Sequence, residues 1–380
     1  MNILYWTPMY WPDVGGIETI ARQMVRALTQ RGHRLCVVAS HGQTEQPDRA
    51  ATDTVPVYRF PFWQASVRQD LRRMLQIRKE VISLKLSFQP DVLHINFSGY
   101  TAYFQLSTAD TSPVPTLVAL YSNLAGSQSG PTSLLDRLLC AADRVVAASE
   151  DTLEAARRRA PAIENRSSVI YAGVDTRRPA PPPPEFRPPH LLCLGRLAEE
   201  KGIDVALRAF ALLRPCHPDA VLTVAGDGPA RADLEQLAAS LGIDEAVRFT
   251  GFVSDEQKTS LFEAASIFIL PSRCAEAFPL VALEAARQAR PVVASRLGGL
   301  PEAVLHERTG RLVDAEDPAA LAGAVRTLLA DPEQARRMGL RGRERVLESF
   351  SLDGYIRQFE EQYARLVEKK NNERKDNLGS

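Results

Sequence analysis

The chain has 380 residues, a formal net charge of zero and 45% apolar residues. This length and composition are ordinary for a soluble globular protein with two domains or one large one. A balanced charge excludes the global field that attracts nucleic acid, so we expect no nucleic-acid partner. No window approaches the roughly 18 apolar residues of a membrane span.

Cysteine use and the start of the chain both bear on the cellular compartment. None of the five cysteines forms a C-x-x-C pair or a zinc-like cluster, so we expect reduced thiols. The chain begins with "MNILYW", a strand-like run that lacks the features of a signal peptide. We therefore expect a cytoplasmic protein. The chain has no D-x-D pair, H-x-x-x-H pattern or Cys/His cluster, so no metal site is predicted.

Short apolar runs alternate with helical patterns in the first half of the chain. Helical patterns occur at residues 18–31 and 67–86, among others. Strands that alternate with helices indicate a parallel sheet covered on both faces, so we expect a Rossmann-like α/β domain over residues 1–178. The predicted strands are "NILYW", "HRLCVVAS", "VPVYRFP", "PDVLHIN", "PTLVALYS", "DRVVAAS" and "SVIYAG".

The helical pattern at residues 67–86 is strongly basic. A basic amphipathic helix can lie on an anionic membrane surface. More often such a helix belongs to a domain and keeps its charged face in solvent. Peripheral contact with the inner face of the membrane therefore stays open as an alternative. The cations of this segment are Arg68, Arg72, Arg73, Arg78, Lys79 and Lys85.

The sharpest change in composition is the proline run "PAPPPPEFRPP" at residues 179–189. Such a run is extended and stiff, so we expect an interdomain linker. The strand–helix alternation then restarts, which predicts a second Rossmann-like domain over residues 190–351. We expect a last helix at residues 352–369 and a disordered tail at residues 370–380. Two doubly wound domains should face a cleft that binds ligands at the carboxyl ends of the strands.

The run "SRCAEAFPLVALEAARQARPVV" at residues 272–293 places two glutamates around a proline. Proline is tolerated in the first turn of a helix, so Pro279 predicts a helix over residues 280–290. The first amides of that helix would lack internal partners and would form an anion site. Glu276 in the loop and Glu284 one turn inside would flank this site. Alternatively, Glu284 complements the helix dipole and Glu276 is solvated.

Two further segments could hold an anionic ligand. Arg196 and Lys201 follow a predicted strand in "GRLAEEKGID" and suit a diphosphate, because Arg196 can grip phosphate bidentately and Lys201 is a compact charge. The alternative is two solvated cations beside Glu199 and Glu200. "GGIE" at residues 15–18 lets the backbone approach a ligand, or is a plain turn. It is not a G-x-G-x-x-G fingerprint, so nicotinamide binding is not favoured.

Together these motifs resemble the retaining GT-B glycosyltransferases of the glycogen-synthase-like "group 1" family (glycosyltransferase family 4). The two glutamates separated by seven residues are the most specific motif. The resemblance implies a GT-B fold and a retaining hexosyltransferase that works without a metal or cofactor. It also implies that the last helix, at residues 352–369, crosses back onto the first domain. The motifs that carry it span nearly the whole chain: "GGIE", "ADRVVAAS", "GVD", "LGRLAEEKG", "AGDGP", "GFVS", "AEAFPLVALEA" and "GGLPE".

The resemblance also implies roles for individual residues. Glu276 would contact the transferred sugar near the reacting carbon, Glu284 would hold the ribose hydroxyls, and Val253 would lie beside the base. Fixed cations and helix-end amides would stabilise the leaving diphosphate without a metal. The expected catalytic residues are Glu276, Arg196, Lys201 and Tyr121. The expected donor-binding residues are Gly15, Gly16, Arg196, Lys201, Val253, Phe278, Leu280, Val281 and Glu284.

The chain departs from the family pattern at three positions. Tyr121 stands where many relatives have a histidine, Ala277 where glycine is common, and Ala172 where asparagine is frequent. Tyr121 and His94 are therefore the acceptor-side candidates, with a structural role as the alternative. The expected reaction moves a sugar from a nucleotide sugar, UDP-linked rather than GDP-linked, to a glycan, lipid-linked or small-molecule acceptor. The other functions considered are a sugar-nucleotide epimerase on the same fold and a non-catalytic nucleotide-sugar-binding subunit.

Overall fold

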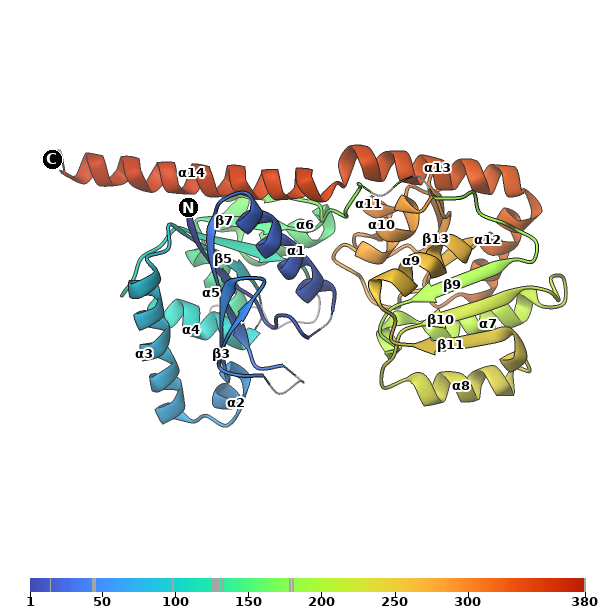
Figure 1. Cartoon of the computed structure of the whole chain (residues 1–380), viewed down its shortest axis with the longest axis horizontal. Coiled ribbons are helices and arrows are strands. Elements are labelled where there is room, and N and C mark those ends of the chain that lie inside the picture. Colours follow the sequence, from blue (N-terminus) through green and yellow to red (C-terminus); the bar gives the residue numbers. More distant parts are fainter. Residues whose placement is uncertain are drawn as a thin grey trace. The chain divides into compact units, whose positions relative to one another are not determined.

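The computed structural model describes residues 1–13, 15–42, 46–97, 99–122, 124, 130, 133–177, 179 and 181–378. The chain divides into two compact units. The first comprises Met1–Tyr171 together with Tyr355–Ser380, and the second comprises Ala172–Gly354. Each unit is a sheet of mainly parallel strands with helices packed against it (Figure 1).

The sheet of the first unit has, among the described residues, eight strands in the order β3-β4-β2-β1-β5-β6-β7-β8. Of the strand pairs that the structure describes in this sheet, only β3 and β4 are antiparallel. The strand order reverses between β1 and β5, and ligands of such folds bind outside the carboxyl ends of the strands at this switch point. The strands are β1 (Asn2–Trp6), β2 (Arg34–Ser40), β3 (Arg49–Thr52), β4 (Val55–Phe60), β5 (Val92–Asn96), β6 (Thr116–Leu120), β7 (Arg144–Ala147) and β8 (Ser167–Val169).

Helices of the first unit share a core with the strands of its sheet, to which they contribute buried residues such as Phe62, Ile77 and Leu138. The helix predicted at residues 67–86 is wrong in its start, because the chain turns between α2 and α3. Gln69 has a left-handed φ of 51°, and Asp70 caps α3 by accepting the amide of Arg73 at 2.9 Å. The helices are α1 (Gly16–Gln30), α2 (Phe62–Val67), α3 (Leu71–Phe88), α4 (Gly99–Ala109), α5 (Leu134–Ala141), α6 (Glu150–Arg159), the 3₁₀ helix η1 (Pro161–Arg166) and α14 (Leu352–Leu378).

The last helix, α14, is longer than the sequence predicted. It continues to Leu378, so the disordered tail expected at residues 370–380 is wrong over the residues that the structure describes. Residues 368–377 contain no glycine or proline and are rich in lysine, glutamate and arginine, which favour a helix. Gly379 and Ser380 lie outside the described residues. From Tyr355 onward α14 belongs to the first unit.

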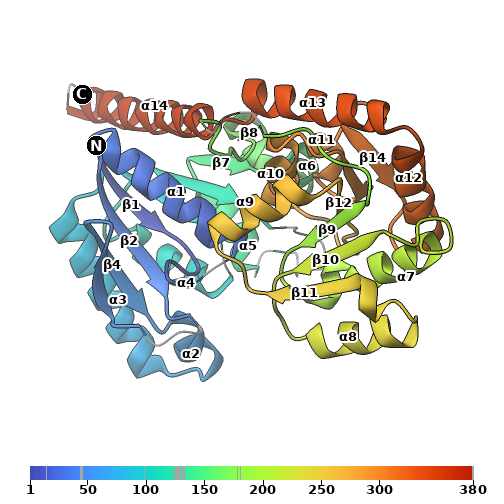
Figure 2. The ribbon, with the colours of Figure 1, turned by 45° about the vertical axis from the view of Figure 1, so that its right-hand side comes forward.

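The sheet of the second unit has six described strands, all parallel, in the order β11-β10-β9-β12-β13-β14 (Figure 2). This is the strand order of a dinucleotide-binding fold, with its switch point between β9 and β12. The segments that follow these two strands are therefore where a ligand is expected. The strands are β9 (His190–Leu194), β10 (Val221–Ala225), β11 (Val247–Gly251), β12 (Ile267–Leu270), β13 (Val292–Ser295) and β14 (Gly310–Val313).

Both faces of this second sheet are apolar, and its helices cover them. The main core contains Phe210, Val224 and Ile269. In the described part of the chain, no helix is long and apolar enough to cross a membrane. The helices are η2 (Glu199–Lys201), α7 (Ile203–Leu213), α8 (Arg231–Ser240), η3 (Asp244–Ala246), α9 (Asp255–Ala264), α10 (Leu280–Arg287), α11 (Leu300–Ala303), α12 (Pro318–Ala330) and α13 (Pro332–Ser349).

The proline run at residues 179–189 is part of the second unit, so its prediction as an interdomain linker is wrong. The chain passes from one unit to the other at Tyr171 and Ala172. Phe186 is buried in the core of the second unit. Arg290 donates to the carbonyl of Pro182 at 2.9 Å, and Arg336 donates to the carbonyl of Pro184 at 3.3 Å. These contacts fix the run. Arg178 and Ala180 lie outside the described residues.

Candidate functional site

Glu276 lies in the loop between β12 and α10, and two side chains hold its carboxylate. The amine of Lys201 donates to Oε1 at 2.9 Å, and the hydroxyl of Ser272 donates to the same oxygen at 2.5 Å. Ser272 is fully buried just after β12, and Lys201 ends the segment after β9. Because β9 and β12 are neighbours at the switch point, the fold joins residues 75 positions apart. Glu276 is therefore not a solvated side chain.

The backbone of Glu276 is held by the loop that contains "GGLPE". The amide of Gly299 donates to the carbonyl of Glu276 at 2.8 Å. Gly298 has a left-handed φ of 53°, and a Cβ on it would lie 2.5 Å from that carbonyl oxygen. Only glycine fits at this position without moving the backbone. The "GGLPE" loop therefore positions Glu276.

Helix α10 begins at Leu280, as the proline predicted, but ends at Arg287 instead of residue 290. Ala289 has a left-handed φ of 55°, which stops the helix. Pro279 is the N-cap residue and supplies no side-chain hydrogen bond. The amides of Leu280 and Val281 therefore lack a capping side chain, and such a helix start favours an anion. Glu276 lies in the loop just before this end of the helix.

Glu284 lies one turn inside α10 and pairs with Lys258, which the sequence analysis missed. The amine of Lys258 lies 2.6 Å from Oε1 of Glu284 and 3.2 Å from the Asp255 carboxylate. Burial lowers the pKa of the Lys258 amine, but the carboxylates of Glu284 and Asp255 raise it more, so its pKa is above the ordinary value. Lys258 is therefore a charged partner of Glu284 at neutral pH.

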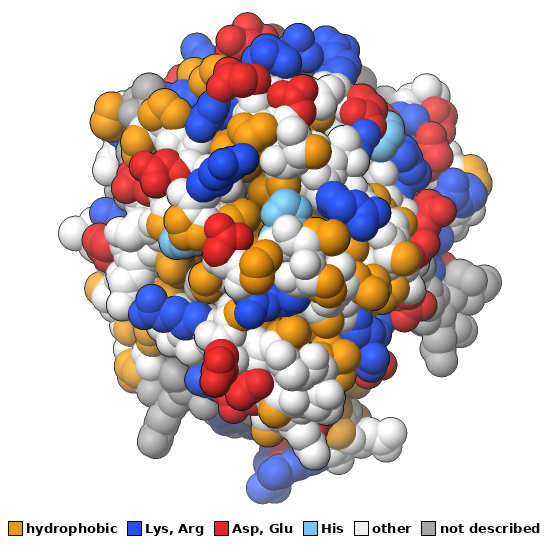
Figure 3. All heavy atoms as spheres, turned by 90° about the vertical axis from the view of Figure 1, so that its right-hand side faces the viewer, with side chains coloured by type: hydrophobic (Ala, Val, Ile, Leu, Met, Phe, Trp, Pro, Cys, Tyr) orange, Lys and Arg blue, Asp and Glu red, His pale blue; other side chains and the backbone are white. Residues whose placement is uncertain are grey.

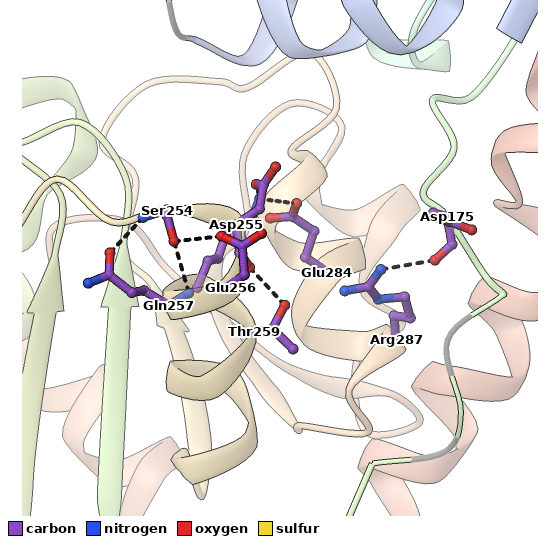
Figure 4. A network of polar contacts seen from close by, with 9 residues as sticks. Asp175, Ser254, Asp255, Glu256, Gln257, Thr259, Glu284 and Arg287 are labelled. Atoms are coloured by element: carbon purple, nitrogen blue, oxygen red, sulfur yellow. Dashed lines mark hydrogen bonds and ion pairs between the residues drawn. The ribbon is translucent and has the colours of Figure 1, made fainter. Parts of the chain in front are cut away.

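Ser254 and Gln257 form a capping box at the start of α9 (Figure 4). Ser254 accepts from the amide of Gln257, while the Gln257 side chain accepts from the amide of Ser254 at 2.8 Å. This reciprocal capping box follows Val253 directly and fixes where the helix begins. "SDEQ" at residues 254–257 could have revealed the capped helix start, and Lys258 is the next residue. The sequence carries no local sign of the partner of Lys258.

Arg196 is exposed to solvent, unlike Lys201, and the two glycines of "GGIE" lie outside any tight packing. The Arg196 side chain is 64% exposed and pairs with Glu200, which is the solvated alternative considered for it. Gly16 begins α1, and a Cβ added to it would meet no atom within 4 Å. A Cβ on Gly15 would meet only the flexible carboxylate of Glu18. Internal packing therefore does not require glycine at residue 16.

His94 is not available to a substrate, so its prediction as an acceptor-side residue is wrong. It is fully buried, and both ring nitrogens are bonded. The Asn96 amide nitrogen donates to the Tyr5 hydroxyl at 3.0 Å, so the Asn96 oxygen accepts from His94 Nε2 at 2.9 Å. His94 Nδ1 therefore accepts from the Tyr363 hydroxyl at 2.7 Å. Burial lowers the pKa of His94 to about 4, so the ring is neutral.

Tyr121 and Phe278 both make contacts inside their own units. The Tyr121 hydroxyl lies 2.5 Å from the hydroxyl of Tyr355 on α14, and the Tyr121 side chain is half-buried. This contact supports the structural alternative for Tyr121, and its acceptor-side role stays a prediction. Phe278 is buried with its ring centroid 5.4 Å from that of Phe350. Across the described residues, no three His, Cys, Asp or Glu side chains are placed to hold a metal ion.

Comparison with known proteins decides the family. "Glycosyltransferase Family 4" matches residues 14–178, and "Glycosyl transferases group 1" matches residues 178–345. A glycogen synthase of Mycobacterium tuberculosis is 31% identical to this chain, over 92% of this chain and 91% of the relative. The chain belongs to the group 1 glycosyltransferases. It is therefore an enzyme of the hexosyltransferase class, and the family predicted from the motifs is confirmed.

Further similar proteins agree with this family. A GDP-mannose-dependent alpha-(1-6)-phosphatidylinositol monomannoside mannosyltransferase of Mycolicibacterium smegmatis is 39% identical over 47% of this chain and 51% of the relative. A sucrose-phosphate synthase from Thermosynechococcus elongatus has a TM-score of 0.81 and 22% identity, and covers 97% of this chain and 100% of its own. Anabaena HepE in complex with UDP has a TM-score of 0.76 and 20% identity, with 96% and 100% covered. These two structures confirm the GT-B fold of the group 1 glycosyltransferase.

Proposed function

We propose that this glycosyltransferase moves a hexose from a nucleotide sugar to its acceptor with retention at the anomeric carbon and without a metal ion. The observation that carries this proposal is the cluster of Glu276, Lys201 and Ser272 at the carboxyl ends of β9 and β12. The cluster lies directly before the uncapped start of α10. A carboxylate, an ammonium group and free helix amides thus occur together where this fold binds ligands.

The cations and amides would stabilise the leaving group. Cleavage of the sugar–phosphate bond leaves negative charge on the diphosphate, which the amides of Leu280 and Val281 and the amine of Lys201 would face. An ammonium group has three donors, so Lys201 can hold Glu276 and a phosphate oxygen together. Arg196, now beside Glu200 in solvent, would turn to the diphosphate and add a bidentate contact.

The acceptor would attack from the face that the diphosphate leaves. A bond forms between the acceptor oxygen and the anomeric carbon as the bond from that carbon to the phosphate oxygen breaks. The acceptor proton goes to the departing phosphate oxygen. Glu276, with its carboxylate fixed by Ser272 and its carbonyl fixed by Gly299, would orient the sugar during this step. Glu284 would hold the ribose hydroxyls and share its charge with Lys258.

The donor and acceptor are proposed from the relatives. A UDP-linked hexose is the first candidate, because a structural neighbour was solved with UDP and UDP-glucose. A GDP-linked mannose is the second, because a relative similar over about half of this chain is GDP-mannose-dependent. The acceptor is a glycan, a lipid-linked sugar or a small molecule, reached in the cytoplasm.

Thermal unfolding with a panel of nucleotide sugars tests the donor. A ligand at about 100 times its Kd adds roughly 2.7 kcal/mol to the free energy of unfolding, so UDP-glucose or GDP-mannose should raise Tm clearly. Proton NMR of the product should then show the same anomeric configuration as the donor. Inversion would contradict the proposal, as would isomerised sugar from donor alone, which is the epimerase outcome.

A further inference from the structure

One surface of the first unit exposes apolar side chains in a regular series. Trp63 and Val67 of α2 are 56% and 47% exposed, and Leu71 and Leu75 of α3 are 72% and 58% exposed. Within each helix the two residues are four positions apart, so Trp63 and Val67 share one face of α2, and Leu71 and Leu75 share one face of α3. The buried faces of the same helices, which include Phe62 and Ile77, pack into the core. The exposed series therefore has no role in that core.

Cations accompany this apolar series. Residues 62–79 contain five basic residues and one acidic residue, whereas the whole chain has a formal charge of zero. The acidic residue is Asp70, whose carboxylate caps α3. Arg68, Arg72 and Lys79 are exposed. The basic charge is therefore concentrated here. By contrast, the face of the molecule in Figure 3 intersperses acidic and basic side chains.

Helix α4, which packs against α2 and α3, also exposes aromatic side chains. α2, α3 and α4 pack together in the first unit, and Phe104 of α4 lies against Phe62 at 4.8 Å between ring centroids (Figure 1). Tyr100 and Tyr103 of α4 are 45% and 39% exposed. Tyrosine and tryptophan favour the headgroup level of a bilayer, because their rings are apolar with one polar atom. The three neighbouring helices thus expose aromatic side chains, leucines and arginines.

The position of these helices relates the surface to the reaction. α2 follows β4 and α4 follows β5, so both helices begin at the carboxyl edge of the first sheet. β5 forms the switch point of that sheet with β1. A molecule held at this surface therefore lies near the edge where this fold receives its ligands.

We propose that the surface formed by α2, α3 and α4 docks the enzyme on a bilayer that contains anionic lipid, from which it takes a lipid-linked acceptor. Leucines enter the boundary of the acyl chains while arginines meet anionic headgroups, as for other interfacial helices. A second copy of this chain is a poorer occupant, because two basic faces would repel each other. The acceptor class rests on the proposed function, whereas the docking itself does not.

Sedimentation of the full chain with vesicles tests the docking. The protein should bind vesicles of phosphatidylcholine with about one third phosphatidylglycerol, and far less to phosphatidylcholine alone. L71Q/L75Q and, separately, R68Q/R72Q should each lower the partition coefficient about tenfold or more. The matched control is L340Q/R341Q, which changes an exposed leucine and its exposed arginine neighbour on α13 and should bind like the wild type.

Three results would overturn the docking. The first is equal binding to neutral and anionic vesicles, and the second is no loss of binding in either double variant. The third is a dimer in vesicle-free solution that L71Q/L75Q dissociates, since a second copy would then be the occupant. The Tm rise given by UDP-glucose or GDP-mannose, measured on the same samples, separates the two proposals. If the wild type does not bind the anionic vesicles but a nucleotide sugar still raises its Tm, the docking alone is wrong. If it binds the vesicles but neither nucleotide sugar raises its Tm, the proposed function alone is wrong.

Discussion

Replacing Gly298 by alanine should damage catalysis by moving Glu276. The added Cβ would lie 2.5 Å from the carbonyl oxygen of Glu276 and 2.9 Å from its amide nitrogen. Ordinary contact begins at 3.4 Å, so the carbonyl must recede by roughly 1 Å. The hydrogen bond of 2.8 Å from the amide of Gly299 to this carbonyl would then be lost or lengthened.

The size of the effect follows from two separate costs. An L-residue held at a φ of 53° loses about 1–2 kcal/mol, and the weakened hydrogen bond adds about 1 kcal/mol, so the free energy of unfolding should fall by roughly 2–3 kcal/mol. A displacement of about 1 Å at a reacting group can lower the rate by about 10²-fold. We therefore expect kcat of G298A to fall by about two orders of magnitude. Affinity for the nucleoside diphosphate should change much less, because Glu276 is expected to contact the sugar.

Steady-state kinetics, calorimetry with the nucleoside diphosphate and thermal unfolding check this prediction together. The matched control is G323A in α12, where a Cβ would meet no atom within 4 Å and where alanine favours the helix by about 1 kcal/mol. G323A should keep its kcat and its Tm, or gain a little stability. If G298A turns over like the wild type, the loop yields without displacing Glu276 and the positioning argument is wrong.

Four further predictions concern other parts of the chain. Glu284→Gln should weaken nucleoside diphosphate binding by about 1.5–3 kcal/mol in calorimetry, because the ribose hydroxyls lose a charged acceptor. Turnover should survive EDTA; loss that magnesium or manganese restores would refute a metal-free site. Tyr121→Phe should lower Tm together with activity if the bond to Tyr355 is its only role, and should lower activity alone if it serves the acceptor. Burial lowers the pKa of His94 from 6.5 to about 4, so the unfolded chain takes up the proton first as the pH falls. The stability that His94 contributes is complete above about pH 6.5 and should fall by up to roughly 3 kcal/mol towards pH 4. Urea unfolding between these pH values should show this slope in the wild type and a flatter one in H94Q.

The sequence by itself determined the elements whose causes are local. Alternating apolar strands and amphipathic helices predicted two parallel sheets, because each pattern repeats within a few residues. Pro279 predicted where α10 begins, since proline suits the first turn of a helix. The family motifs are also short and local. Element ends were less certain: the turn at Gln69 and the end of α10 at Ala289 depend on left-handed residues that are neither glycine nor asparagine.

Only the tertiary structure decided which side chains meet. Lys201 reaches Glu276 across 75 residues, because the neighbouring strands β9 and β12 end at one edge of the sheet. Lys258 of α9 reaches Glu284 of α10 across 26 residues. His94 was taken for an acceptor-side residue, yet it pairs with Tyr363 across 269 residues, because α14 returns to the first unit. A contact between distant residues leaves no periodic pattern in the sequence, since its energy arises only when the sheet has formed and water has been excluded. The side chains that hold Glu276 and Glu284 could therefore not be named before the fold was known.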